Sequence, residues 1–400
     1  MARPKPTVFL ILLLGGLSAF GPLSIDLYLP ALPAIGMAIG ADGATMQQTL
    51  AAFLIGISLG QLFYGPLSDR IGRRPPILFG IAVYTVASLL CVFAETGGQM
   101  IGLRFVQGLG SCAALVIARA VVRDRFDHQD TARIFSWIVL VMGLAPIFAP
   151  LVGSLILAIS HWQVIFWALA AYGALIGLWV YLGLPESRSD DTRQAAGESG
   201  FFGGMIVLMK TPQFRGYTFG QAFNMASLFA YVASAPAILI TQYGVSEAMF
   251  GWLFGINAAG LIAGSQVNRY LLDHFHADTI MRNANRLAVL AGIVLVAIAF
   301  SGFGGLVGLM VALFLVLATY AFIAGNANAG GLSVDPRRAG AASALLGATG
   351  FGVGAASAAI TGALPLPASQ ATAIVSLTSL VISWWVFRAA LRPQAHLAAV

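Results

Sequence analysis

The chain has 400 residues, of which 59% are hydrophobic and only 9% are charged, and its mean hydropathy is +0.87. No soluble domain has an interior large enough to bury that share of apolar side chains, so the composition excludes a soluble globular protein and indicates a chain embedded in a lipid bilayer. The net charge of +6 comes from basic residues spaced out at loop positions rather than gathered on one face. We therefore expect no nucleic-acid partner.

A hydrocarbon core of about 30 Å takes about 20 apolar residues per helix, so the chain has room for about twelve spans. The first six are expected near residues 8–30, 46–68, 76–94, 98–122, 134–158 and 162–183. A polar, turn-rich segment interrupts the pattern, and the other six are expected near residues 216–241, 247–272, 280–301, 304–328, 339–363 and 369–390.

These spans predict an all-α integral membrane protein made of two six-helix bundles. The bundles are expected over residues 1–184 and 213–400, joined by a central cytoplasmic loop over residues 185–212. The basic, then apolar start of the chain is similar to a secretory signal, but no small-residue cleavage site follows it. We therefore interpret residues 8–30 as the first span.

The basic residues predict the orientation. All of the 21 Lys and Arg residues except Arg104 and Arg119 fall on one side of the predicted membrane. By the positive-inside rule this side is cytoplasmic, so both termini are expected in the cytoplasm, which requires an even number of spans. Arg119 lies one turn before Arg123 near the cytoplasmic end of the fourth span, where its side chain is expected to snorkel to the interface.

The two halves are weakly repeated. Residues 264–269 align with residues 65–70, and the offset of 199 residues is about half the chain. Such an offset is expected for two parallel six-helix repeats. The alignment places the neutral Asn268 where the first half has Asp69.

Asp26 and Arg104 are the two opposite charges expected deep within the first six spans. Each lies about seven residues, or about 10 Å, to the outer side of the predicted midpoint of its span. An ionisable group at this depth costs about 2.5 to 3.5 kcal/mol on insertion scales, which favours a functional role. We hypothesise that the two side chains face one aqueous cavity and form, or alternately form and break, an ion pair.

The alternative is a static ion pair that only fixes helix packing. A buried pair adds little net stability compared with apolar replacements, and Pro22 and Pro30 loosen the helix around Asp26. A substrate or a helix movement that changes the distance to Arg104 would change the proton affinity of Asp26, as proton coupling requires.

No catalytic or metal-binding pattern competes with this interpretation. The five histidines lie in loops or at the ends of spans, and no phosphate-binding loop is present. The only cysteines, Cys91 and Cys112, lie in apolar runs and are expected to pack as small hydrophobic residues. We therefore expect a protein that is not an enzyme and that uses no cofactor or metal.

Three motifs make the chain resemble the major facilitator superfamily. The segment Gly65-x-Leu67-x-Asp69-Arg70-x-Gly72-Arg73-Arg74-Pro75 is similar to the superfamily's loop signature between helices 2 and 3. Residues 104–110 resemble its helix 4 motif, in which the arginine is associated with proton coupling. Residues 149–154 resemble its antiporter motif, with Ala149 and Ser154 in place of two glycines.

More narrowly, residues 22–33 and 118–124 look like the Bcr/CflA branch, which includes bicyclomycin and chloramphenicol exporters. The resemblance implies proton-driven efflux of such drugs across a bacterial inner membrane by alternation of the two bundles. It implies a small-molecule drug, protons and the lipid bilayer as partners, a monomer, and the proton gradient as the energy source.

The resemblance also implies roles for individual residues. Asp26 would be the proton-carrying acid and Arg104 its cationic partner. Asp69 would cap the predicted eleventh span, and a loop arginine would pair with Asp124, so that both contacts latch the cytoplasmic side and must break for it to open. The whole set expected to act in gating is Gly65, Asp69, Arg70, Gly72, Arg73, Arg74, Asp124, Pro146, Pro150 and Gly153. The alternative is a loop that only follows the positive-inside rule, which explains its arginines but not Asp69 or its glycines.

Polar and aromatic side chains in the spans are candidates for contact with substrate, because an amphiphilic pocket accepts apolar drugs and a buried amide needs a partner. The candidates are Asp26, Tyr28, Arg104, Gln107, Asn224, Tyr231, Asn257, Tyr320 and Asn326. Each position is also compatible with simple helix packing.

Two rival functions remain. A transporter of an amino acid, peptide or sugar could use the same fold, although the second half has no ionisable residue in the middle of a span, as a zwitterion would usually require. A membrane receptor or scaffold that transports nothing would use Asp26 and Arg104 as a structural pair, so Asp26→Asn would lower the yield of folded protein rather than coupling.

Overall fold

The computed structural model describes residues 8–126, 128–187 and 202–390, and these ranges contain helices and no strand. Twelve helical segments in them are long and apolar enough to cross a membrane. The predicted fold class, an all-α membrane protein of twelve spans, is therefore confirmed.

The helices of the two halves follow the expected order and lie close to the expected bounds. The first half contains α1 (Val8–Asp26), η1 (Leu29–Ala31), α2 (Leu32–Ala38), α3 (Gly43–Ile71), α4 (Arg74–Cys91), α5 (Gly97–Arg125), α6 (His128–Ile159) and α7 (Gln163–Gly183). The second half contains α9 (Gly203–Lys210), α10 (Pro212–Pro236), η2 (Ala237–Gln242), α11 (Glu247–Leu272), α12 (Ala277–Ser301), α13 (Gly305–Ser333), η3 (Pro336–Arg338), α14 (Ala339–Ala363) and α15 (Ala368–Ala390).

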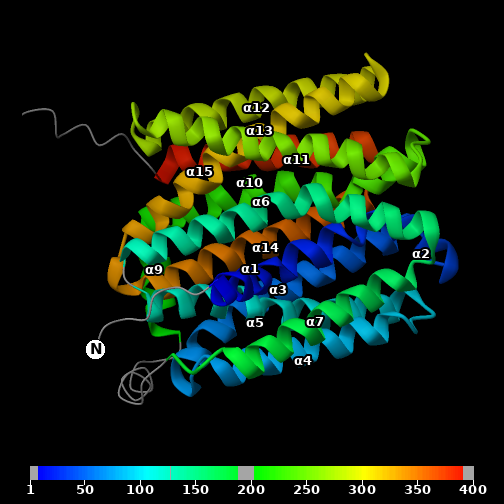
Figure 1. Ribbon diagram of the computed structural model, residues 1–400. Coiled ribbons are helices and arrows are strands. Elements are labelled where there is room, and N and C mark those ends of the chain that lie inside the picture. Colours follow the sequence, from blue (N-terminus) through cyan, green and yellow to red (C-terminus); the bar gives the residue numbers. More distant parts are fainter. Residues whose placement is uncertain (1–7, 127, 188–201, 391–400) are drawn as a thin grey trace, which may run out of the picture.

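The helices of each half pack mainly against one another, and two helix pairs make most of the contact between the halves. These pairs are α3 with α14 and α6 with α11. In Figure 1 the helices α12 and α13 form one edge of the molecule, α4 and α7 form the opposite edge, and α14, α1 and α3 lie between them. Any movement of one half against the other must therefore act on the two joining pairs.

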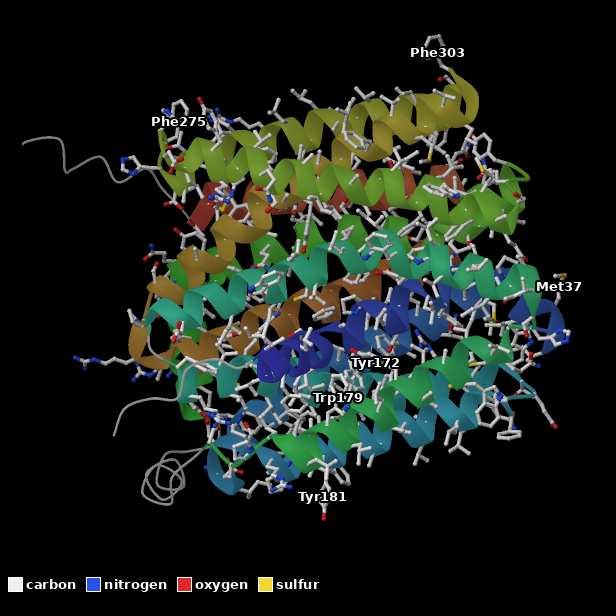
Figure 2. The ribbon with its side chains drawn as sticks, in the orientation of Figure 1. Met37, Tyr172, Trp179, Tyr181, Phe275 and Phe303 are labelled. Atoms are coloured by element: carbon white, nitrogen blue, oxygen red, sulfur yellow. The ribbon has the colours of Figure 1, made fainter. Side chains whose placement is uncertain are left out.

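The two ends of the bundle differ in charge. The end at which α3 terminates carries Arg70, Arg73 and Arg74 and also holds α9 and the start of α14, and we call it the arginine-rich end. The opposite end holds α2 (Figure 1). Large apolar and aromatic side chains point outward from the bundle, among them Met37, Tyr181 and Phe303 in Figure 2. This exposed apolar surface fits a protein surrounded by lipid.

The first span is broken in its middle. Pro22 lies inside α1, which ends at Asp26, and the span continues through η1 and α2 to Ala38. Because the span is longer than expected, Asp26 lies closer to its middle than the sequence predicted. The break also places η1 against α10 and α11 of the second half.

Glycines allow α3 and α5 to approach closely. A Cβ atom added at Gly108 of α5 would lie 2.2 Å from the carbonyl oxygen of Phe53, and one added at Gly56 of α3 would lie 2.3 Å from that of Phe105. Real atoms do not approach so closely, so neither position accepts a larger residue without movement of a helix. The contact fixes the position of Phe53 relative to α5.

We expect Gly108→Ala to force α3 and α5 apart and to destabilise the protein by about 1–3 kcal/mol. Gly102→Ala is the matched control, because it lies on the same helix with no neighbouring atom within 4 Å of the added Cβ. Thermal unfolding of both purified variants in detergent checks this. Equal melting temperatures for the two variants would show that the close approach is not a packing constraint.

Candidate functional site

Arg104 lies on α5 and is completely buried. Its guanidinium carbon is 4.3 Å from the ring centre of Tyr28 and 4.4 Å from that of Phe53. Its Nη1 donates a hydrogen bond of 2.5 Å to the side-chain oxygen of Gln107, and its Nη2 donates one of 3.0 Å to the backbone oxygen of Ser24. A planar guanidinium can stack on rings and donate from its edge at the same time. Two aromatic faces and two neutral acceptors therefore hold this charge.

The acceptors of Arg104 are themselves held in place by a polar network. The amide nitrogen of Gln107 donates a hydrogen bond of 2.7 Å to Ser88 Oγ of α4. Ser24 Oγ and the hydroxyl of Tyr84 share another of 2.7 Å. Because these bonds join α1, α4 and α5, they fix the surroundings of the guanidinium. Ser24, Ser88 and Tyr84 were not among the predicted site residues.

Asp26 does not pair with Arg104 in this structure. Its side chain is nine-tenths buried, and among the described residues it has neither an ion-pair partner nor a hydrogen-bond partner. Arg104 binds the backbone oxygen of Ser24 instead. Ser24 and Asp26 are two positions apart on a helix, so their side chains point about 200° apart around its axis. The acid and the base share a region of the first half but are not paired in this structure, and the hypothesis that they alternately form and break an ion pair stays a prediction.

The predicted antiporter motif of α6 packs onto the break after α1. A Cβ atom added at Gly153 would lie 2.4 Å from the carbonyl oxygen of Leu27 and 2.9 Å from the ring of Pro30. On the opposite side, a Cβ added at Gly251 of α11 would lie 3.0 Å from the carbonyl oxygen of Pro150. The motif thus connects the broken first span with the second half. Pro150 of the motif and Pro146, which precedes the motif, both lie inside α6.

Polar side chains without protein partners gather along α10. Asn224 is buried and has no hydrogen-bond partner for its side-chain oxygen among the described residues, and the same holds for Gln221. Buried hydroxyl groups on the same helix also lack partners there, namely those of Thr218, Ser227 and Ser234. Buried polar atoms are normally bonded, so these atoms can accept or donate to a substrate or to water. The sequence singled out only Asn224.

The predicted residues Asn257 and Tyr231 lie together. The amide nitrogen of Asn257 donates a hydrogen bond of 2.9 Å to the hydroxyl of Tyr231, whereas its oxygen has no partner among the described residues. The Tyr231 ring stacks on Phe254 with their centres 5.6 Å apart. The pair therefore presents one free acceptor beside an aromatic surface.

Other predicted substrate residues serve packing in this structure. Asn326 of α13 donates a hydrogen bond of 2.9 Å to the side-chain oxygen of Asn268 on α11, and another of 2.8 Å to the backbone of Phe322. Tyr28 and Gln107 hold Arg104. Tyr320 is partly buried on α13, and nothing in its surroundings indicates a ligand.

The loop after α3 is organised around Arg73, which is almost completely buried. Its Nη2 is 2.8 Å from the carboxylate of Asp69, and its Nε donates a hydrogen bond of 2.7 Å to Asp124 of α5. The predicted pairing of a loop arginine with Asp124 is thus present. Glu186, after α7, accepts hydrogen bonds from the backbone nitrogens of Arg73 and Arg74, at 2.9 and 3.0 Å. The sequence analysis did not identify Glu186.

The remaining loop residues shape this turn. Gly72 has a φ of 97°, which favours glycine, and it allows the chain to turn directly from α3 into α4. Arg74 donates a hydrogen bond to the backbone oxygen of Tyr181 and stacks over its ring. Gly65 and Arg70 lie on the wall of a neighbouring cavity.

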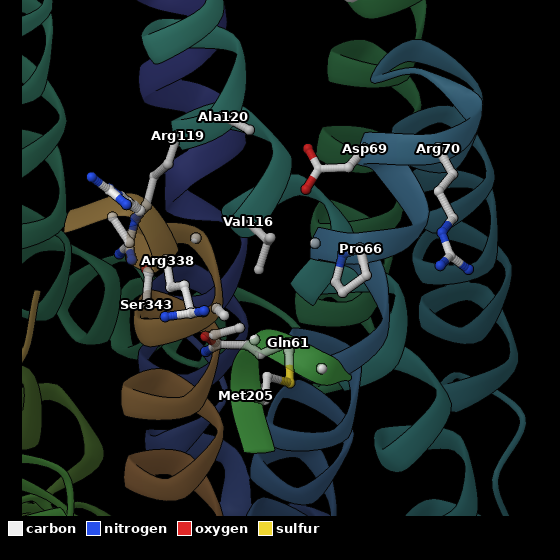
Figure 3. Close-up of a pocket in the computed structure, with 18 of the residues that line it drawn as sticks. Gln61, Pro66, Asp69, Arg70, Val116, Arg119, Ala120, Met205, Arg338 and Ser343 are labelled. Carbon is white, nitrogen blue, oxygen red and sulfur yellow. The ribbon is translucent and has the colours of Figure 1, made fainter. Parts of the chain in front are cut away.

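This cavity has a volume of about 840 Å³ and lies between α3, α5, α9 and the start of α14 at the arginine-rich end. Figure 3 shows Asp69 on one side and Arg119 and Arg338 on the other. Deeper in the bundle α3 and α14 are in contact, because Ser58 Oγ donates a hydrogen bond of 2.7 Å to the backbone oxygen of Ala348. A further close approach, of Gly362 to Gln47, lies near the opposite end. The two helices therefore separate toward the arginine-rich end.

We expected Asp69 to cap α14 across this interface. In this structure Asp69 forms an ion pair with Arg73 of its own half. The residue at the start of α14 is Arg338, whose side chain makes no capping hydrogen bond, and the first residues of α14 face the same cavity as Asp69. Closing the cavity would bring the two together.

Comparisons with known proteins agree with the motifs. Residues 12–359 match the Major Facilitator Superfamily. The chain is 33% identical over 357 residues to the bicyclomycin resistance protein homolog of Haemophilus influenzae, with 89% of each chain covered. It is 31% identical over 291 residues to the chloramphenicol resistance protein of Pseudomonas aeruginosa, covering 72% of this chain and 68% of that protein.

Solved structures show the same fold at low sequence identity. A D-xylose-proton symporter superposes with a TM-score of 0.70 at 12% identity, covering 94% of this chain and 96% of that one. A bacterial homolog of the lysosomal transporter Spinster gives a TM-score of 0.69 at 16% identity, with 96% of both chains covered. These relatives are transporters, not enzymes. From the family match, the relatives and the fold together, the chain belongs to the Major Facilitator Superfamily.

Proposed function

We propose that the chain exports small amphiphilic antibiotics, such as chloramphenicol-like or bicyclomycin-like compounds, in exchange for protons by alternating access. The observation that carries the proposal is the Asp26 carboxyl, buried without a partner among the described residues and placed at the break where the first span meets the second half. The resistance proteins to which the chain is similar support the substrate class.

Exchange follows from the cost of burying a charge. A buried carboxyl without a partner favours its protonated, neutral form, because an unpaired charge in an apolar site is expensive. A substrate that donates a hydrogen bond to the carboxylate favours the ionised form, so its binding releases one proton from Asp26. Uptake of another proton on the opposite side would then release the substrate.

The neutral acceptors of the second half complete the proposed pocket. The free oxygens of Asn224 and Asn257 would bind donor groups of the drug, and Phe254 would pack against its apolar parts. Arg104 would position α1 rather than bind substrate directly, since its guanidinium is enclosed by Tyr28 and Phe53.

We further propose that the arginine-rich end faces the cytoplasm of a bacterial cell and that the protein works in the inner membrane as a monomer. The positive-inside rule supports this orientation. In that orientation the cavity beside Asp69 opens on the cytoplasmic side. The proton gradient would supply the energy, and no cofactor is required.

We expect Asp26→Asn to abolish drug-induced proton release, because an amide cannot lose a proton in this range, while leaving expression unchanged. The assay follows lumenal pH in everted vesicles on addition of chloramphenicol, with an amino acid as a metabolite control. Asp42→Asn is the matched variant, because Asp42 is a helix cap outside the spans and asparagine caps equally well. Proton release at the wild-type level in Asp26→Asn would contradict the proposal.

We expect Asn224→Leu to weaken drug binding about tenfold without loss of stability, because its amide has no protein partner to lose among the described residues. Asn326→Leu is the control with the opposite outcome: it breaks two hydrogen bonds and should cost about 1–3 kcal/mol of stability. Drug binding and thermal unfolding are measured on both purified variants. A destabilised Asn224→Leu with normal drug affinity would assign Asn224 to packing.

A further inference from the structure

The expectation that Arg119 snorkels to the membrane interface stays a prediction. Arg119 lies on α5, is partly buried, and lines the cavity at the arginine-rich end, as Figure 3 shows. Its one polar contact is between Nη2 and the sulfur of Met142, at 4.0 Å. Among the described residues, no carboxylate pairs with it. A guanidinium in this position lacks the anion that such groups normally bind.

The start of α14 lines the same cavity, and Figure 3 shows Arg338, the residue before it, on the same side as Arg119. Ala339, Gly340 and Ala341 line it, and the preceding Arg338 makes no capping hydrogen bond with its side chain. The N–H of Ala339 donates to the backbone oxygen of Pro336. The N–H groups that follow it have no earlier carbonyl within α14 to bond, and the dipole of this 25-residue helix favours negative charge at that end. Two separate elements thus direct donors into one space.

The charges around the cavity are strongly unbalanced. Its lining contains five arginines, Arg70, Arg73, Arg119, Arg337 and Arg338, and one carboxylate, that of Asp69. That carboxylate is already bound to Arg73, and Arg338 is paired with Asp335. The cavity is therefore a basic space whose only lining acid is engaged.

We propose that this cavity binds a phosphate-type anion, held by Arg119, by Arg338 beside its pairing with Asp335, and by the N–H groups of α14 that follow Ala339. The volume of about 840 Å³ exceeds that of one phosphate group, so the anion can belong to a larger molecule. Both a soluble phosphate compound and the headgroup of an anionic phospholipid have this chemistry. The exposed apolar residues Ile206 and Val207 of α9, beside the cavity, make the lipid source accessible.

A bound anion would occupy the end of α14 that closure would bring to Asp69. It would therefore hold α3 and α14 apart at the arginine-rich end and slow the conformational change that closes it. This inference concerns binding outside the proposed drug site, so it does not depend on whether the substrate is an antibiotic.

The first test uses the full chain in detergent, with inorganic pyrophosphate as the probe at constant ionic strength. We expect saturable binding, which Arg119→Gln weakens about tenfold or more through loss of charge-assisted hydrogen bonds. Arg286→Gln removes the same charge from α12, away from the cavity, and should change affinity less than twofold. Equal losses in the two variants would mean that only net charge matters and would overturn the site.

A second variant covers the case in which Arg119→Gln does not fold. No atom lies within 4 Å of a Cβ added at Gly340, so Gly340→Asp places a tethered carboxylate at the start of α14. It should raise the melting temperature and abolish the response to pyrophosphate. A Gly340→Asp variant that binds pyrophosphate as the wild type does would contradict the proposal.

The same proteins in lipid nanodiscs identify the source of the anion. Stabilisation by phosphatidylglycerol relative to phosphatidylcholine, lost in Arg119→Gln, indicates a lipid headgroup. Stabilisation by pyrophosphate alone indicates a soluble compound. A wild-type protein that responds to neither would overturn the inference.

Discussion

The first half is built around the need to accommodate one guanidinium group within a membrane-embedded bundle. An unpaired charge in such a place is costly, and no described residue serves as a counter-ion here. Rings from α3 and from the break after α1 cover both faces of Arg104, and a side-chain oxygen and a backbone oxygen accept its protons. Ser24 and Tyr28 belong to the first span and Phe53 to α3, so the arginine ties both to α5.

This arrangement leaves Asp26 available. If the acid were the counter-ion of Arg104, protonating it would leave a buried charge unpaired. Because neutral groups hold the arginine, the carboxyl can gain or lose a proton without disturbing the packing of the first half. The separation of the two charges therefore suits Asp26 to proton exchange better than the expected ion pair does.

The sequence predicted the fold well because length and hydropathy are strong signals in membrane proteins. The twelve spans agree closely with the helices, and residues 247–272 and 339–363 agree to the residue. The depth of a residue along its span could also be predicted from the sequence, and this placed Asp26 and Arg104 in one region. The direction in which a side chain points around the helix axis could not be predicted, because it depends on the break after α1 and on the packing of α5. That is why the partners of Arg104 were missed.

At the arginine-rich end, the two halves of the predicted repeat join their helices by different contacts. In the first half Asp69, Arg73 and Asp124 join α3 to α5 by charge. At the corresponding place in the second half, the neutral amides of Asn268 and Asn326 join α11 to α13. The alignment predicted the neutral Asn268 but not its partner, because that contact depends on the packing of two helices.

The central claim is that substrate binding removes a proton from Asp26. Infrared difference spectroscopy of the purified protein tests it directly, because a protonated carboxyl has a carbonyl band separate from those of carboxylates and amides. The account predicts that adding chloramphenicol to the wild type removes one such band, and that Asp26→Asn lacks both the band and the change. A drug-induced loss of the band that persists in Asp26→Asn, or drug binding with no change in the wild type, would contradict it.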